Sequence, residues 1–305
     1  MIRAEAQRLL ALALEARLEG PDAAKWVERL SPQRQSLVDA VRFLAENGDE
    51  EAATQLAANV WRLWLTLGDV AGGRELLRAA LSVGEGRPSR ARALALYGDG
   101  LLAFRSGAQT ESQARNQAAL DTARAVGDRE AEALALVGLS RVALRAGDYT
   151  LVCSLADRAR EITRNLDPTV DVWPLHLLAA GTRLSGDYDK AIALYTESLE
   201  LNRRLGNNRM VCTELHNIGH VELHRGNVDA ARRCFADCAE IRNPNDLFAT
   251  AMTHLNQAAL AFAQGERETT AERLQRMQAT LYEAGIVLDP DDAFEVKWLN
   301  DQFAD

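Results

Sequence analysis

Apolar residues recur every three or four positions along most of the chain, in runs of helical length that glycines interrupt. The interrupting glycines are separated by 39 or 40 residues: Gly68, Gly107, Gly147, Gly186, Gly226 and Gly265. A constant interval of this kind indicates a repeat. Each of these glycines lies between two amphipathic runs, so the repeating unit is a helical hairpin. Hairpins without intervening strands bury their apolar faces only by stacking, and the pattern therefore predicts an all-α solenoid, a superhelix with a concave inner surface.

The spacing places six hairpins between residues 51 and 285. Their helices are expected at 51–67 with 70–83, 89–106 with 109–126, 129–146 with 149–166, 170–185 with 188–205, 209–225 with 228–243, and 247–264 with 267–284. An aspartate that can cap the second helix follows three of the glycines: Asp69, Asp148 and Asp187.

Helical segments are also predicted on both sides of the repeats. Residues 1–50 contain three stretches, 3–19, 22–30 and 33–46, divided by Gly20-Pro21 and Ser31-Pro32, and form an expected N-terminal helical cap. Residues 286–305 form an expected C-terminal capping helix. Its apolar residues, which can cover the sixth hairpin, are Phe294, Val296, Trp298, Leu299 and Phe303.

The charge of the chain argues against binding to nucleic acid. The formal net charge is −9, although Arg outnumbers Lys by 32 to 3. A phosphate-binding surface favours a basic balance, so no direct nucleic-acid partner is expected. The acidic residues that accumulate toward the C-terminus are expected to be a solvated end of the chain: Glu283, Asp289, Asp291, Asp292, Glu295, Asp301 and Asp305.

No membrane partner is expected, and a cytoplasmic location is. The apolar run from Leu9 to Leu14 is too short for a signal peptide or a membrane span. The four cysteines, Cys153, Cys212, Cys234 and Cys238, form no CxxC pair and are expected to be reduced.

The segment from Gly186 to Tyr195, Gly-Asp-Tyr-Asp-Lys-Ala-Ile-Ala-Leu-Tyr, resembles the tetratricopeptide repeat: a glycine turn, an aromatic residue, a small alanine and a second aromatic residue. Gly226 to Phe235 repeats the pattern. The match is weaker in the second hairpin, where Ser112 and Asn116 replace the small and the aromatic residue. The resemblance implies a fold of stacked helical hairpins.

Residues 20 to 81 resemble the start of the sensor region of large bacterial regulators, the signal-transduction ATPases with LuxR-type or SARP-type DNA-binding domains. The resemblance rests on Gly20-Pro21-Asp22 with Trp26, on Trp61-Arg62-Leu63-Trp64 and on Gly73-Arg74. It implies that the repeats sense a ligand or protein partner. The GxxxxGK[ST] phosphate loop is absent, and too few residues follow position 290 for a helix-turn-helix domain. The chain therefore resembles the sensor part alone.

Projection of the first helix of each hairpin onto the concave surface predicts a cationic and aromatic inner wall. The candidate ligand-binding residues are Asn59, Arg62, Tyr97, Arg105, Arg141, Arg145, Trp173, His176, Arg183, His216, Asn217, His220, His224 and Asn256. Such a wall favours an acidic peptide or another ligand that carries a carboxylate. In an alternative interpretation, the arginines only solvate the helices and Trp173 packs in the core.

His216, His220 and His224 form a stripe along one helix face, and His residues four apart can chelate a metal. Without a further carboxylate or thiolate ligand, a polar lining of the groove is the preferred interpretation. In His220-x-Glu222-x-His224 the glutamate lies about 200° round the helix from each histidine, which argues against peptidase chemistry. The cysteines near position 238 are expected to be packing residues, and Trp61 and Trp64 to support helix packing.

The sequence therefore predicts a non-enzymatic binding scaffold, without cofactor or metal, that recognises a protein, peptide or small ligand in bacterial regulation or signalling. An enzyme in the groove, or a metal-dependent binding protein that uses the His and Arg residues, is the alternative.

Overall fold

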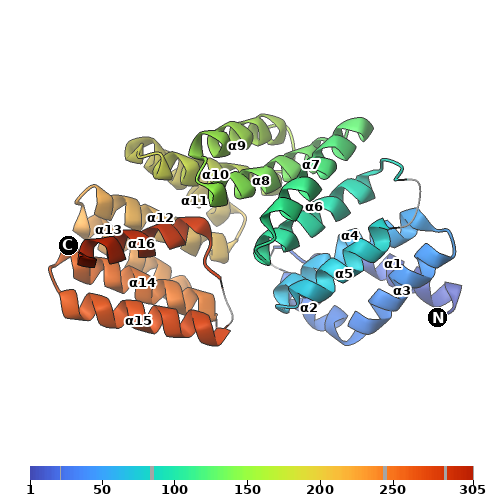
Figure 1. Ribbon diagram of the computed structural model, residues 1–305, viewed down its shortest axis with the longest axis horizontal. Coiled ribbons are helices and arrows are strands. Elements are labelled where there is room, and N and C mark those ends of the chain that lie inside the picture. Colours follow the sequence, from blue (N-terminus) through green and yellow to red (C-terminus); the bar gives the residue numbers. More distant parts are fainter. Residues whose placement is uncertain (21, 83–85, 243–245, 285–286, 305) are drawn as a thin grey trace. The chain divides into compact units, whose positions relative to one another are not determined.

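The computed structural model describes residues 1–20, 22–82, 86–242, 246–284 and 287–304, with only the backbone of 303 and 304. These residues form helices and connecting turns, with no strand among them (Figure 1). The chain is an all-α solenoid of helical hairpins, as the sequence predicts.

The N-terminal helices are α1 (Arg3–Glu15), α2 (Ala23–Leu30) and α3 (Arg34–Glu46), with a 3-10 turn, η1 (Ser31–Gln33), before α3. The six hairpins are α4 (Glu50–Thr66) with α5 (Val70–Leu81), α6 (Arg90–Arg105) with α7 (Gln109–Val126), α8 (Arg129–Ala146) with α9 (Tyr149–Thr163), α10 (Val172–Leu184) with α11 (Tyr188–Arg204), α12 (Asn208–His224) with α13 (Val228–Ile241), and α14 (Leu247–Ala263) with α15 (Arg267–Ala284). A second 3-10 turn, η2 (Pro168–Asp171), precedes α10, and α16 (Pro290–Ala304) ends the chain. The sequence predicts that the second helix of the first hairpin ends at residue 83, which lies outside the described residues.

The glycine interval has a direct backbone cause. All six glycines that divide the hairpins have a positive φ, between 74° and 89°. Only glycine adopts this left-handed conformation without steric cost, so it ends one helix and lets the next begin within about three residues. The side chain of Asp69 then accepts a hydrogen bond from the Gly72 amide at 2.9 Å. Asp148 and Asp187 cap α9 and α11 in the same way, which confirms the three predicted caps.

The structure consists of two compact units, and the division between them passes through helices α8, α9 and α10. Unit 1 comprises Met1–Ala143 and Ser154–Pro174, and unit 2 comprises Leu144–Cys153 and Leu175–Asp305. In unit 1, Trp61 and Trp64 are 1% and 2% exposed, which confirms their predicted role in helix packing. A Cβ atom on Gly98 would lie 2.9 Å from the Trp61 indole nitrogen, so the glycine makes room for this ring.

The weak repeat match in the second hairpin has a structural explanation in unit 1. Ser112 donates a hydrogen bond to the Gly100 carbonyl at 2.8 Å, and Asn116 donates to the Ser112 carbonyl at 2.9 Å. The Asn116 side chain occupies the space beside two glycines, because a Cβ atom on Gly138 would lie 1.9 Å from its Oδ1 atom. A polar pair that fits between glycines thus replaces the small and aromatic residues of the other repeats.

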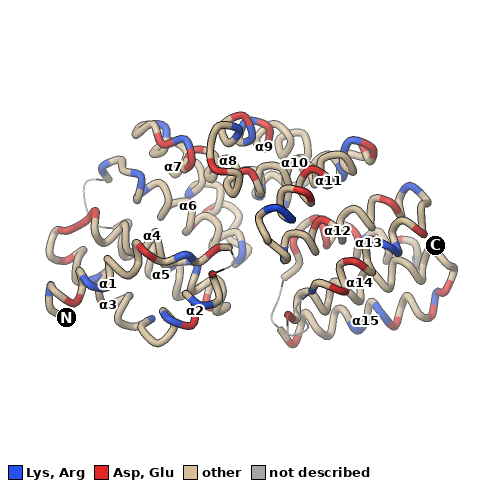
Figure 2. The backbone as a smooth tube through the Cα atoms, turned by 180° about the vertical axis from the view of Figure 1, so that it is seen from behind, with Lys and Arg blue, Asp and Glu red and all other residues tan. Residues whose placement is uncertain are grey.

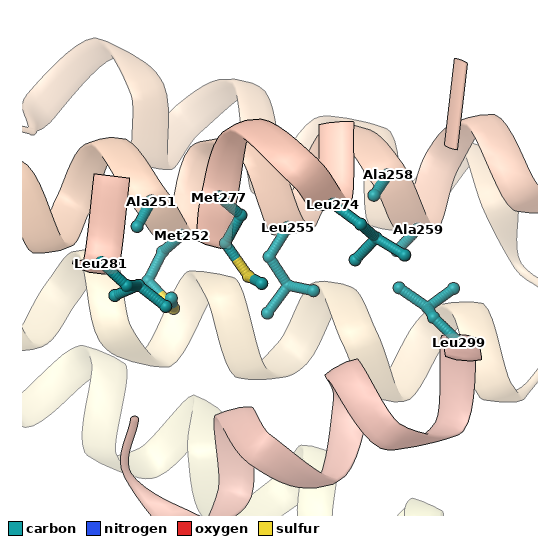
Figure 3. Packing of buried hydrophobic residues seen from close by; sticks show 9 residues of the cluster. All are labelled: Ala251, Met252, Leu255, Ala258, Ala259, Leu274, Met277, Leu281 and Leu299. Atoms are coloured by element: carbon teal, nitrogen blue, oxygen red, sulfur yellow. The ribbon is translucent and has the colours of Figure 1, made fainter. Parts of the chain in front are cut away.

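In unit 2, α16 packs against the last hairpin. Leu299 is fully buried and points toward α14 and α15, where Ala259 and Leu274 belong to the same apolar cluster (Figure 3). The partly buried Val296 and Trp298 pack against this cluster as well. The apolar side of α16 therefore covers the sixth hairpin, and the side chain of Phe303 lies outside the described residues.

Candidate functional site

In unit 1 the structure brings together three of the predicted inner-wall residues. Arg141 donates a hydrogen bond to the Tyr97 hydroxyl at 3.3 Å, and its guanidinium lies 4.4 Å from the centre of the Trp173 ring. The Tyr97 side chain is buried, whereas Arg141 and Trp173 are half-buried. The Arg141 guanidinium thus forms a cation–π contact of modest strength with the Trp173 ring.

Other predicted residues of unit 1 have local partners. The Arg62 guanidinium lies 4.3 Å from the Trp61 ring centre and pairs with Glu19 at 2.9 Å. Asn59 donates to the Gln55 carbonyl of its own helix. Arg105 is half-buried in the last turn of α6. These residues do not converge with Tyr97 and Arg141 on one point.

Unit 2 contains the densest group of predicted residues. They come from three successive first helices, with His176 and Arg183 on α10, four residues on α12 and one on α14. Arg183 Nη1 donates to Asn217 Oδ1 at 2.7 Å, and His220 Nε2 lies 3.1 Å from Asn256 Oδ1. We call the set His176, Arg183, His216, Asn217, His220, His224 and Asn256 the basic cluster. Arg145 belongs to unit 2 too and is half-buried at the end of α8.

Helix α16 covers the basic cluster with its acidic first turns (Figure 1). Asp292 Oδ1 lies 3.1 Å from His216 Nε2, and Glu295 Oε2 lies 2.9 Å from His224 Nε2 and 3.4 Å from His220 Nδ1. Arg183 Nη2 donates to the Asp291 carbonyl at 3.1 Å and lies 3.8 Å from Glu295 Oε1. The helix thus contacts residues of both α10 and α12 that are 71 to 108 positions away in the sequence.

This arrangement corrects the expectation that the C-terminal acidic residues are solvated. Asp291, Asp292 and Glu295 are only 6%, 7% and 1% exposed. Buried carboxylates are tolerated because cationic and imidazole groups face them. Glu283 and Asp301 are exposed as expected, Asp289 is half-buried, and Asp305 lies outside the described residues.

Aromatic contacts extend the site along α16. The Trp298 ring meets His224 edge to face, with ring centres 4.6 Å apart, and meets Phe262 at 5.5 Å. The Phe294 ring centre lies 6.3 Å from His224. His224 therefore contacts an anion and two aromatic rings of the same helix.

A buried glutamate that sequence reasoning missed anchors His176. Glu214, on α12, is completely buried; its Oε1 atom accepts a hydrogen bond from Ser198 Oγ at 2.7 Å and lies 3.1 Å from His176 Nδ1. Because Glu214 faces the preceding hairpin rather than the concave surface, the inner-wall projection could not identify it. Its proximity in sequence to the histidine stripe was the only available signal.

The charge state of the site follows from its burial and its neighbours. Burial alone would raise the pKa of Glu295, yet His220, His224 and the Arg183 guanidinium hold it well below its usual value. Burial lowers the pKa of His220 and so favours its neutral ring. The Arg183 guanidinium is therefore the permanent positive charge that faces Glu295. The site thus holds an ionised Glu295 at neutral pH.

Asp291 titrates in the opposite direction. Its burial, together with the neighbouring Asp292, raises the pKa of Asp291 to about 6, although Arg183 and His176 oppose the shift. Asp289 adds a further unfavourable charge. Ionisation of Asp291 therefore destabilises the docked state of α16.

Several buried polar atoms around Arg183 have no hydrogen-bond partner among the described residues. They are Arg183 Nε, Tyr195 Oη, Asn217 Nδ2 and His216 Nδ1. An unpaired buried polar atom costs about 1–3 kcal/mol. Three of the four are donors, so this part of the site can accommodate further acceptor oxygens.

Within the described residues, no group of three or more His, Cys, Asp or Glu side chains is arranged to hold a metal ion. The ring nitrogens of the histidine stripe instead contact Asp292, Glu295 and Asn256. The four cysteines form no disulfide with one another and are half-buried, and Cys212 Sγ donates to the Cys238 carbonyl at 3.3 Å. These observations fit the predicted packing role of the cysteines.

Lys and Arg positions alternate with Asp and Glu positions along the backbone of each unit (Figure 2). Among the described helices, none combines the length and the apolar character that a bilayer crossing requires.

Comparisons with known proteins identify the repeat. The tetratricopeptide repeat model matches residues 172–242, which include α10 to α13 and most of the basic cluster. The search of curated proteins gave no match.

Solved structures are similar over most of the chain. A Rap protein in complex with the competence and sporulation factor has 14% identity and a TM-score of 0.65, covering 96% of this chain and 80% of its own. NprR in complex with its cognate peptide NprX has 14% identity and a TM-score of 0.62, covering 88% of this chain and 82% of its own. The signal transduction ATPase with a tetratricopeptide repeat sensor from Pyrococcus horikoshii has 14% identity and a TM-score of 0.57, covering 85% of this chain and 44% of its own. At these identities the likeness is one of fold.

Proposed function

Because the chain is a helical-repeat protein of the tetratricopeptide type, we propose that it is a non-enzymatic scaffold that binds a protein or peptide partner in bacterial regulation. Two proteins of similar fold are described with a bound factor or peptide, which supports a peptide-sized partner. The basic cluster of unit 2 is the proposed binding site.

The observation that carries the proposal is the acidic helix already bound to this cluster. Asp292 and Glu295 of α16 meet three histidines of α12, and Arg183 faces the same carboxylates. A surface that accepts two buried carboxylates within one chain has the chemistry to accept them from another. We therefore infer that the partner presents an acidic peptide or another carboxylate-bearing group.

The remaining features of the proposal follow from composition. The net charge of −9 disfavours a nucleic-acid partner, since phosphates would be repelled by most of the surface. We assign the protein to the cytoplasm, where the four free cysteines would remain reduced.

Selection from a random peptide display library on the full chain tests the proposal. The chain and a D292N/E295Q variant, in which α16 has lost two carboxylates, serve as targets. We expect acidic peptides to be selected, with an affinity that falls as salt increases.

A histidine comparison assigns the site. The substitutions H216Q and H220Q should weaken binding of a selected peptide by at least tenfold and preserve helicity measured by circular dichroism. The matched control is H254Q, because His254 is a half-buried histidine of α14, whereas the α16 carboxylates Asp292 and Glu295 pair with histidines of α12. Selection of uncharged peptides would contradict the proposal. So would an affinity of H216Q and H220Q for the peptide that equals the affinity of H254Q.

A further inference from the structure

We propose that α16 is a displaceable internal occupant of the basic cluster, and that the partner replaces it by presenting a helix with the same order of acidic and apolar residues. This inference rests on the proposed function. It specifies the chemistry of the partner and adds a step that binding must include, the release of α16.

Four of the α16 residues that contact other helices of unit 2 lie on one helix face. Asp292, Glu295, Val296 and Leu299 occupy positions i, i+3, i+4 and i+7, which is the spacing of a single stripe on an α-helix. The first two contact the histidines, and the last two pack on α14 and α15. A helix in a groove is recognised by anchors at this spacing. The expected partner therefore has two carboxylates one turn apart, followed after another turn by an aliphatic residue.

Two charged residues on the opposite side of α16 are exposed to solvent. Lys297 and Asp301 form an ion pair at 2.5 Å with side chains that are 74% and 59% exposed. The two side chains pair with each other across one turn of the helix. They provide matched positions at which the charge of α16 can be changed without altering the stripe.

The fit between α16 and the cluster is incomplete. Arg183 Nε, Tyr195 Oη and Asn217 Nδ2 are buried donors without a partner in the described residues, and Arg183 and Asn217 bind each other directly. None of the described residues, those of α16 included, offers these donors an acceptor. A partner that places another carboxylate oxygen there would bind more favourably than α16 does, residue for residue.

The covalent connection explains how an incomplete fit can still occupy the site. Five residues separate the end of α15 from the start of α16 in the sequence. A short tether gives a segment an effective concentration on the order of millimolar. A partner in solution must overcome this concentration, so any weakening of α16 should raise the apparent affinity of the partner.

The test uses a synthetic peptide with the sequence of residues 286–305, labelled with fluorescein, and the full-length chain. Anisotropy titrations compare the unaltered chain with D292N/E295Q and with the control D301N. We expect D292N/E295Q to bind the peptide at least tenfold more tightly than the unaltered chain, and D301N to match the unaltered chain. A peptide with the same two acids replaced by Asn and Gln should not bind.

Hydrogen exchange provides a second measurement that needs no substitution. Addition of saturating unlabelled peptide to the unaltered chain should accelerate exchange of the α16 amides of the protein and leave α4 unchanged. This comparison remains decisive even if D292N/E295Q unfolds unit 2.

The outcomes separate the two proposals. Peptide binding with unchanged exchange in α16, or with equal affinity for all three chains, overturns displacement and leaves the proposed function intact. If neither the unaltered chain nor D292N/E295Q binds the peptide at a peptide concentration of about 1 mM, displacement is overturned. The proposed function is tested separately, and failure of the library selection would overturn it. A dimer in which α16 of one chain docks on another would assign the face to a second copy and overturn the inference.

Discussion

The Glu295 carboxylate is the central polar contact of docked α16. It is 1% exposed and lies 3.8 Å from the Arg183 guanidinium. At an effective dielectric constant of about 20, the attraction between unit charges at this distance is about 4 kcal/mol. Removal of the charge also removes the cost of burying it. Because a glutamine can still accept a hydrogen bond from His224, we expect E295Q to destabilise docked α16 by about 2–3 kcal/mol.

The assay is amide hydrogen exchange of α16 at pH 7, because a protein of two compact units does not guarantee a single two-state unfolding transition. A loss of about 2–3 kcal/mol corresponds to opening that is roughly 30- to 150-fold more frequent. The control D301N, which breaks only the exposed pair with Lys297, should change α16 opening by a few tenths of a kcal/mol.

The pH dependence gives an independent check with a definite sign. The pKa of Glu295 is lowered in the folded protein, so its contribution is present above the pKa of the free carboxyl and is lost as pH falls through the folded value. The difference between E295Q and the unaltered chain should therefore shrink in strongly acidic solution. Equal α16 exchange in E295Q and D301N at pH 7 would refute the reasoning.

Three further outcomes follow from the structure. Because burial raises the pKa of Asp291 to about 6, α16 docking should weaken by about 1–1.5 kcal/mol as pH rises from 5 to 7, and D291N should lose this dependence in exchange rates corrected for intrinsic chemistry. Leu299 is fully buried against α14 and α15, so L299A should increase α16 opening by about 2–5 kcal/mol in the same measurement, whereas unchanged exchange would show that the apolar end is not an anchor. A Cβ atom on Gly219 would lie 2.2 Å from Phe235, so G219A should lower the stability of unit 2 by about 1–3 kcal/mol in urea denaturation, and a neutral effect would mean that the ring has room to move.

The hairpin pattern could be predicted because its causes are local. The six dividing glycines adopt a positive φ, and aspartates such as Asp69 cap the helix that follows three of these turns. Amphipathic spacing fixed the positions of the helices to within a few residues, for example Glu50–Thr66 where 51–67 was expected. The buried pair Ser112 and Asn116 could be noticed as a departure from the repeat, but the glycines that accommodate it lie on neighbouring helices and were not assigned that role.

The histidine stripe could also be recognised, since His216, His220 and His224 follow helical spacing on a single helix. The carboxylate partners of these histidines could not be recognised from the sequence. An acidic run near a chain end has the same sequence whether it is solvated or paired, and Glu214 approaches His176 only after two hairpins have stacked.

The sequence alone therefore determined the class of fold, the approximate helix boundaries and the spacing of imidazole and guanidinium groups along the helices, because these depend on backbone conformation and helical periodicity. The tertiary structure decided what those groups bind. Asp292 meets His216 across 76 positions, and Glu295 meets His224 across 71. Such contacts depend on the path of the stacked helices, and local sequence does not specify which distant segment that path brings into the site.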